Sequence, residues 1–164
     1  MKTDKVKHIG IIGTGMIGSS LAVLTTGHGY KTTVFARSPQ RAESCRKSIV
    51  TSFKEIEAQK LMTELQIDMC TSYLSFAESY EEMADVDLFF ECVTEDAEIK
   101  HGVYRDIENH CLNVQAICSA SSAIEVDELT KNANRYKDRI IITHPFNPPH
   151  MVPFFELTAG RDTK

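Results

Sequence analysis

A short apolar run followed by three spaced glycines constrains the fold of this chain more than any other feature. Residues 8–12 form a short, β-branched, apolar run, which is typical of a strand buried on both faces of a parallel sheet. Gly13, Gly15 and Gly18 follow in the spacing G-x-G-x-x-G, and a helical pattern continues to Gly27. The order of strand, glycine turn and helix predicts the first part of a βαβ unit.

The glycines have different mechanical roles in such a unit. Gly13 allows a sharp turn after the strand, Gly15 lets a pyrophosphate approach the backbone, and Gly18 lets the helix pack closely on the strand. The free N–H groups at the start of the helix, around Met16 and Ile17, can then bind phosphate. The motif therefore predicts a dinucleotide site, and the alternative is a glycine turn that binds nothing.

The end of the next predicted strand bears on the choice of dinucleotide. Ala36 stands where an NAD-binding unit usually has an acidic residue that accepts hydrogen bonds from the adenosine ribose. Arg37 and Ser38 follow it, and Arg41 lies one helical turn further on. A cation and a hydroxyl here could hold the 2′-phosphate of NADP. Alternatively, Ser38 and the proline after it only start a helix. NAD is the expected cofactor, and NADP stays open.

The rest of the chain alternates strand patterns with helix patterns. Strands are predicted at residues 31–36, 71–74, 87–93, 114–118 and 139–143. Helices are predicted at residues 40–65, as one helix or as two joined near 58–60, at 75–84, after a Thr94 cap, and at 125–132. This alternation predicts a Rossmann-type, doubly wound, mostly parallel α/β sheet with helices on both faces, which binds its ligand at the carboxyl ends of the strands.

Composition excludes several other classes of protein. The 164 residues, 42% hydrophobic and 25% charged, are expected to form one dinucleotide-binding domain over residues 1–164. Without a secretory pattern or a membrane-length apolar run, we expect a cytoplasmic protein that does not contact a membrane. The net charge of -5 argues against nucleic-acid binding. Five cysteines without a C-x-x-C pair indicate neither a disulfide framework nor a metal site.

One histidine stands out as a candidate catalytic group. His144 directly follows a predicted buried strand, and the prolines around it fix the backbone of its loop. Imidazole titrates near neutrality, so it can take a proton from a hydroxyl while a hydride leaves the same carbon for a nicotinamide. Glu156 lies in a second extended segment that can return antiparallel and orient the ring. The alternative is a proline-rich loop with a surface histidine.

The remaining polar candidates are less specific. Ser122 could donate a hydrogen bond to a substrate oxygen, although the serines at 119, 121 and 122 could equally form a turn before a helix. No G-x-S-x-G motif surrounds them, which disfavours nucleophilic serine chemistry. Solvated or capping roles are expected for four other histidines, His8, His28, His101 and His110.

Four motifs taken together resemble the NAD-binding domain of the 3-hydroxyacyl-CoA dehydrogenase family. They are GTGMIG at 13–18, FECVTE at 90–95 with Lys100, SASS at 119–122, and HPFNP at 144–148 with Glu156. The resemblance implies reversible hydride transfer between a nicotinamide cofactor and the 3-hydroxy group of an acyl-CoA, a reaction of fatty acid metabolism. The site roles it implies are a base at His144, its orienting partner at Glu156, a contact to the 3-oxygen from Ser122, a positioning role for Asn147, and flanking of the cofactor by Glu95 and Lys100.

The chain also departs from the pattern of the family. Besides Ala36, Ala120 replaces the asparagine of a serine motif that commonly reads S-N-T-S. The loop at 144–150 looks closer to relatives that oxidise small hydroxy acids or carnitine. Family members continue into a helical domain that completes the substrate cleft and forms the homodimer. We therefore expect a cofactor domain with little activity on its own, and a non-catalytic dinucleotide-binding or sensing module is the alternative of another class.

Overall fold

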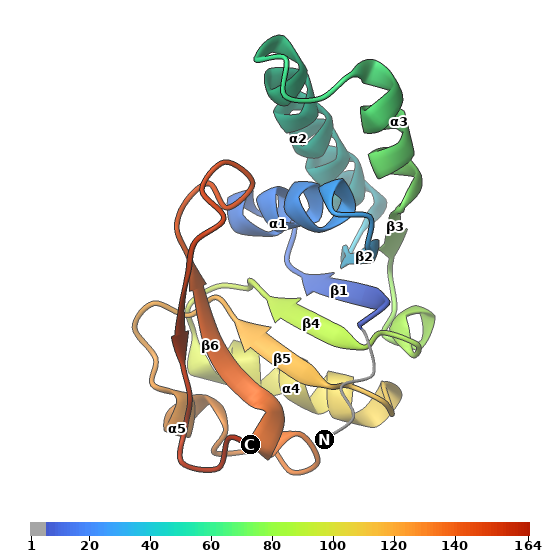
Figure 1. Ribbon diagram of the computed structural model, residues 1–164. Helices are drawn as coiled ribbons and strands as arrows, with labels where there is room; N and C mark the ends of the chain where they lie inside the picture. The colour runs from blue at the N-terminus through green and yellow to red at the C-terminus, as the bar shows by residue number, and fades with distance from the viewer. Residues whose placement is uncertain (1–5) are drawn as a thin grey trace.

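The computed structural model describes residues 6–164, and within them seven strands form one sheet (Figure 1). The strand order is β3-β2-β1-β4-β5-β6-β7, and all neighbouring strands are parallel except β6 and β7. The strands are β1 His8–Ile12, β2 Lys31–Phe35, β3 Leu74–Ala77, β4 Leu88–Glu91, β5 Ala116–Ser119, β6 Ile140–Pro145 and β7 Phe155–Thr158. This order confirms the predicted doubly wound, Rossmann-type α/β fold.

Helices cover both faces of the sheet. They are α1 Met16–Gly27, α2 Pro39–Ala58, α3 Glu64–Ser72, α4 Ala97–His110 and α5 Val126–Leu129, with short 3₁₀ turns at Glu81–Met83 and Lys137–Arg139. Figure 1 shows α1, α2 and α3 together on one side, and α4 and α5 on the other. In the part of the chain that the structure describes, no helix is long and apolar enough to cross a membrane.

Two hydrophobic cores follow from the alternation of side chains along the strands. Ile9 and Ile11 of β1 point to the side of α1 and α2, where they pack in one cluster with Phe53. Ile12 points to the opposite face and belongs to the cluster that contains Phe89 and the buried side of α4. A strand buried on both faces therefore explains why residues 8–12 are apolar throughout.

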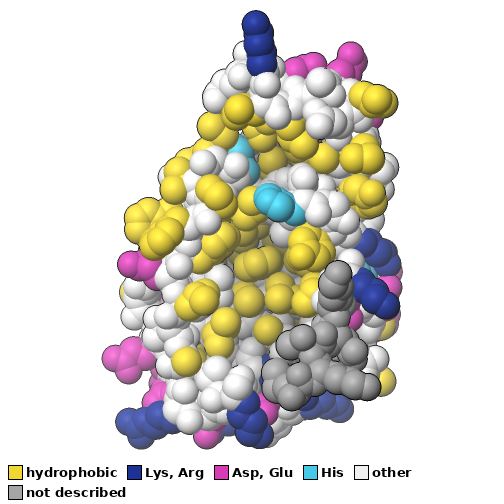
Figure 2. All heavy atoms as spheres, viewed as in Figure 1, with side chains coloured by type: hydrophobic (Ala, Val, Ile, Leu, Met, Phe, Trp, Pro, Cys, Tyr) yellow, Lys and Arg dark blue, Asp and Glu magenta, His cyan; other side chains and the backbone are white. Residues whose placement is uncertain are grey.

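Part of the sheet has no helix in front of it. Figure 2 shows hydrophobic side chains gathered below α1, over β1 and the strands next to it. A hollow of about 390 Å³ opens there, and its walls include Leu24 of α1 together with Leu88 and Phe90 of β4. The ring of Phe90 also stacks on that of Phe155, with 6.4 Å between ring centroids.

The long helical pattern resolves into two helices. α2 ends at Ala58 and α3 begins at Glu64, so the predicted joint near 58–60 is confirmed. Lys60 adopts a positive φ of 59°, which interrupts the helix, and Thr63 caps the new one through reciprocal hydrogen bonds with Gln66.

Four local predictions were wrong. The helix expected at 75–84 is β3 followed by a 3₁₀ turn, and α3 occupies the start of the strand expected at 71–74, because residues 74–77 pair with β2. Asp96, not Thr94, caps α4, since its Oδ1 accepts the Ile99 N–H at 3.0 Å. His8 and His101 are buried, at 4% and 3% exposure, so they are not solvated.

Candidate active site

The glycine loop joins β1 to α1 at the carboxyl edge of the sheet. Gly13 has a φ of +127°, and a Cβ there would lie 2.6 Å from the carbonyl oxygen of Cys92. A Cβ on Gly18 would overlap the Gly13 carbonyl oxygen, whereas a Cβ on Gly15 would meet no atom within 4 Å. Gly13 therefore fits a sharp turn, Gly15 an open approach and Gly18 a close helix contact, as the motif predicts.

The start of α1 is suited to bind an anion. Gly15 is the N-cap residue and offers no side-chain acceptor, and the first turn contains no acidic residue. The first N–H groups of the helix therefore lack a side-chain partner, and the helix dipole places partial positive charge there. Met16 is 68% exposed and Ile17 is half-buried, so this end of the helix is accessible.

A cleft of about 530 Å³ continues from the glycine loop across the end of β2. Its walls include Phe35 and Tyr80, whose rings stack with centroids 4.6 Å apart, and the guanidinium-bearing Arg37 and Arg41. Two α4 carboxylates, those of Glu98 and Asp106, also line it. The cleft could accommodate an adenosine, and it carries both signs of charge.

The position that usually binds the adenosine ribose, Ala36, has no polar side chain here. Ala36 is fully buried, and Ser38 is the N-cap of α2 with its Oγ 3.4 Å from the Arg41 N–H. The predicted helix start is therefore present. Arg37 is exposed at the mouth of the cleft.

His144 and Glu156 face each other across the β6–β7 pair. They are register partners, and His144 Nδ1 lies 3.4 Å from Glu156 Oε2. The predicted antiparallel return is thus confirmed. Because a carboxylate only accepts hydrogen bonds, Nδ1 is the donor in this contact, and Nε2 is left for proton exchange with a substrate.

A second cavity, of about 490 Å³, brings three of the predicted site residues together: its walls include Ser122, His144 and Glu156. Asn147 is not among the residues of these walls. Its Nδ2 donates to the sulfur of Met16 at 3.2 Å, so it links the proline loop to α1.

Glu95 holds the serine loop from below. Its Oε1 accepts hydrogen bonds from the Ser121 hydroxyl at 2.5 Å and from the N–H groups of Ser122 and Ala123 at 3.0 and 2.9 Å. Burial alone would raise the pKa of Glu95, but these donors and the nearby Lys100 ammonium lower the pKa to about 2. Glu95 is therefore an ionised brace for the loop that carries Ser122.

Lys100 does not lie at the surface as a group flanking the cofactor would. Its side chain is fully buried, with Nζ 2.8 and 2.9 Å from the two Glu91 carboxylate oxygens and 3.4 Å from Glu95 Oε2. Lys100 lies inside the protein because it pairs with Glu91, an acid at the end of an apolar strand. That position was the available signal, since a buried carboxylate needs a cation and donors.

Among residues 6–164, no cluster of three or more histidine, cysteine or acidic side chains is arranged to hold a metal ion. The site therefore consists of the glycine loop, two cavities and the His144–Glu156 pair, all at the carboxyl edge of the sheet.

A doubly wound sheet whose first strand leads through such a glycine loop into a helix defines a Rossmann-type dinucleotide-binding domain. Comparison with known families is more specific. The chain belongs to the family described as "3-hydroxyacyl-CoA dehydrogenase, NAD binding domain", which matches residues 8–164. The resemblance seen in the four motifs is thus confirmed, and the family to which the domain belongs is one of NAD-binding domains.

Individual relatives differ in their names. The peroxisomal bifunctional enzyme of Cavia porcellus is 29% identical over 95% of this chain, and the L-carnitine dehydrogenase of Oceanobacillus iheyensis is 30% identical over 96%. The chain spans 21% and 50% of their respective lengths. The crystal structure of (S)-3-hydroxybutyryl-CoA dehydrogenase from Ralstonia eutropha shares the fold, with a TM-score of 0.92 at 23% identity over 97% of this chain and 56% of that one.

Proposed function

We propose that this chain is the cofactor-binding and proton-accepting part of an oxidoreductase that transfers hydride between NAD and the 3-hydroxy group of an acyl-CoA. The observation that carries the proposal is the His144–Glu156 pair at the same sheet edge as the glycine loop. The chain spans at most about half the length of the relatives named above. We therefore propose that a helical domain outside residues 1–164 completes the substrate cleft and forms a homodimer.

The residues at the edge fit the cofactor. The open space at Gly15 and the uncapped start of α1 suit a pyrophosphate, and the cleft beside Phe35 and Tyr80 suits an adenosine. When bound, NAD would supply the hydride acceptor.

The protein groups then handle the proton. His144 Nε2 takes the proton of the substrate hydroxyl as hydride leaves the same carbon, and Glu156 stabilises the imidazolium that forms. Ser122, held by Glu95, donates a hydrogen bond to the substrate oxygen. In the reverse direction His144 returns the proton. Asn147, whose amide contacts the Met16 sulfur, keeps the loop between β6 and β7 close to the start of α1.

NADP is the second candidate cofactor because Ala36 replaces the usual acidic residue and Arg37, which follows it, lines the cleft. Titration of the chain with NADH and NADPH, followed by fluorescence, decides between them. Tighter binding of NADPH that is lost in Arg37→Ala supports phosphate recognition. Much tighter binding of NADH contradicts it, and the acids of α4 then outweigh the arginines.

A small hydroxylated quaternary ammonium compound such as carnitine is the second candidate substrate. The carboxylates of Glu125, Asp127 and Glu156 line the cavity beside His144, and its one lining guanidinium, Arg161, is paired with Asp127 at 3.0 Å. Such a wall favours a cation over the many negative charges of CoA. The name of one relative, an L-carnitine dehydrogenase, agrees with this reading.

A substrate panel tests these proposals. NAD reduction by the full-length enzyme is measured with 3-hydroxybutyryl-CoA, longer 3-hydroxyacyl-CoA esters, small hydroxy acids and L-carnitine. Turnover of the CoA esters supports the leading proposal, and turnover of carnitine alone replaces it with the second. If dinucleotide binds but no substrate is turned over, the chain is a binding or sensing module.

A further inference from the structure

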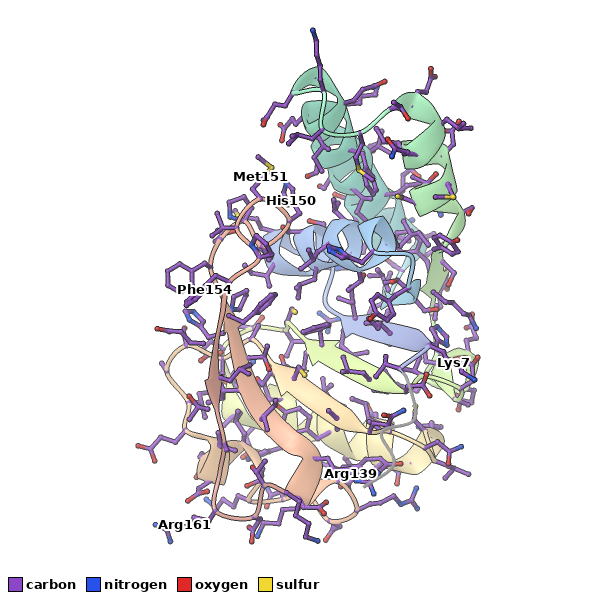
Figure 3. All side chains as sticks on the ribbon, viewed as in Figure 1. Lys7, Arg139, His150, Met151, Phe154 and Arg161 are labelled. Carbon is purple, nitrogen blue, oxygen red and sulfur yellow. The ribbon has the colours of Figure 1, made fainter. Side chains whose placement is uncertain are left out.

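The loop between β6 and β7 is fastened to α1 at two points. Asn147 contacts the Met16 sulfur, and His150 contacts the hydroxyl of Ser20. Met16 and Ser20 are four residues apart, so they lie one turn apart on one side of α1. Figure 3 shows His150 and Met151 at the tip of the loop next to α1, far from Arg161 near the other end of β7.

The contact between Ser20 and His150 uses the backbone N–H and the ring Nδ1 of His150. The Ser20 Oγ accepts the His150 backbone N–H at 3.2 Å, and the same hydroxyl donates to His150 Nδ1 at 2.5 Å. Ser20 is only 3% exposed, so its hydroxyl needs protein partners. Burial lowers the pKa of His150, and the Glu55 carboxylate opposes this only in part, which favours the neutral ring whose Nδ1 can accept the hydroxyl proton.

The loop itself is internally braced. The Pro148 carbonyl accepts the N–H groups of Met151 and Val152, each at 3.0 Å. At the base of the loop, the Phe146 N–H donates to the Phe154 carbonyl at 2.9 Å, and their rings meet edge to face with centroids 5.0 Å apart. A displacement of the tip is therefore transmitted to the base, which lies next to the His144–Glu156 register pair.

We propose that Ser20 and His150 are positioning residues that set the place of His144 relative to the cofactor end of α1. Neither lines the cavity beside His144 or the cleft beside the glycine loop. They act through the braced loop. The inference rests on the proposed function for its purpose, but the mechanical link is testable without a cofactor.

Four variants separate the contact from the bulk of the side chain. Ser20→Ala removes both hydrogen bonds, and His150→Leu removes only the one to the ring. His150→Asn can place an amide group near the position of Nδ1, whereas His150→Gln, the matched control, places it near Nε2. If the link exists, hydrogen exchange of the His150 amide accelerates about five- to tenfold in Ser20→Ala.

The decisive readout is the ring of His144, observed by NMR in the free chain. Ser20→Ala and His150→Leu are expected to shift or broaden its signals, His150→Asn to restore them, and His150→Gln to leave them perturbed. Unchanged His144 signals in Ser20→Ala, despite faster exchange at His150, overturn the proposal. A separate NADH titration reports on the proposed function, so a failure to bind NADH leaves the result for the link intact.

Discussion

Lys100 and Glu91 form an ion pair that is completely buried beneath the active-site edge, with Nζ within 2.9 Å of both carboxylate oxygens. The Glu91 carboxylate also accepts hydrogen bonds from the hydroxyls of Tyr104 and Ser119 at 2.9 and 2.7 Å. One carboxylate thus joins β4, α4 and β5 just below the serine loop. Both charges are hydrogen-bonded, which is the condition under which a buried pair is tolerated.

Breaking this pair should be costly. Lys100→Met leaves the Glu91 carboxylate buried without its cation, so we expect the free energy of unfolding in urea to fall by about 3–5 kcal/mol. The double variant Lys100→Met with Glu91→Gln removes both charges and should recover part of the loss. A single variant as stable as the parent chain would show that the pair is not buried as described.

Stability should also depend on pH through Glu95. Its pKa is about 2 in the folded chain against 4.5 as the ordinary value, so the unfolded chain takes up the proton first as the pH falls. The stabilisation of the folded chain by ionised Glu95 is complete above about pH 4.5 and is lost as the pH falls toward 2. Since Glu95 is an exposed residue, solvent screening reduces it to about 1–2 kcal/mol.

Urea unfolding of the parent chain and of Glu95→Gln at pH 6 and pH 3 measures this contribution. The difference between the two proteins should shrink at pH 3. An equal difference at both pH values would mean that Glu95 is not held as an anion by the serine loop.

Gly15, the N-cap residue of α1, and Gly27, its last residue, allow a matched comparison of two alanine variants. A Cβ on Gly15 or on Gly27 would meet nothing within 4 Å, so alanine at either position should change the stability by about 1 kcal/mol or less. Only Gly15 is placed where a pyrophosphate would approach. Gly15→Ala is therefore expected to weaken NADH binding at least tenfold, and Gly27→Ala to leave it unchanged.

Fluorescence titration with NADH, after thermal melting of both variants, checks this. Equal NADH affinities in the two variants would remove the glycine loop from the cofactor site.

The sequence was sufficient for features that depend on local chain geometry. The turn at Gly13, the strand periods and the order of elements could be predicted because they follow from backbone sterics and apolar patterning. The meeting of Ser122, His144 and Glu156 was also predictable, since the carboxyl ends of parallel strands share one edge.

Features that depend on side-chain depth were not predictable. The Lys100 side chain points into the protein because its partner, Glu91, is buried. The role of Glu95 depends on its hydrogen bonds to the serine loop. β3 was predicted at 71–74, three residues too early, because pairing of residues 74–77 with β2 outweighed the helical character of their acidic neighbours. The contact of His150 could not be predicted because its partner, Ser20, lies 130 residues away in the sequence.

The most direct test of the central claim is the His144→Gln variant of the full-length enzyme, measured for both NADH affinity and hydride transfer. Glutamine cannot exchange the proton, so the rate should fall by about 10²–10⁴-fold while the NADH affinity stays within about twofold. A retained rate would remove His144 as the base. A large loss of NADH binding with an unchanged rate for the bound complex would assign it to the cofactor site instead.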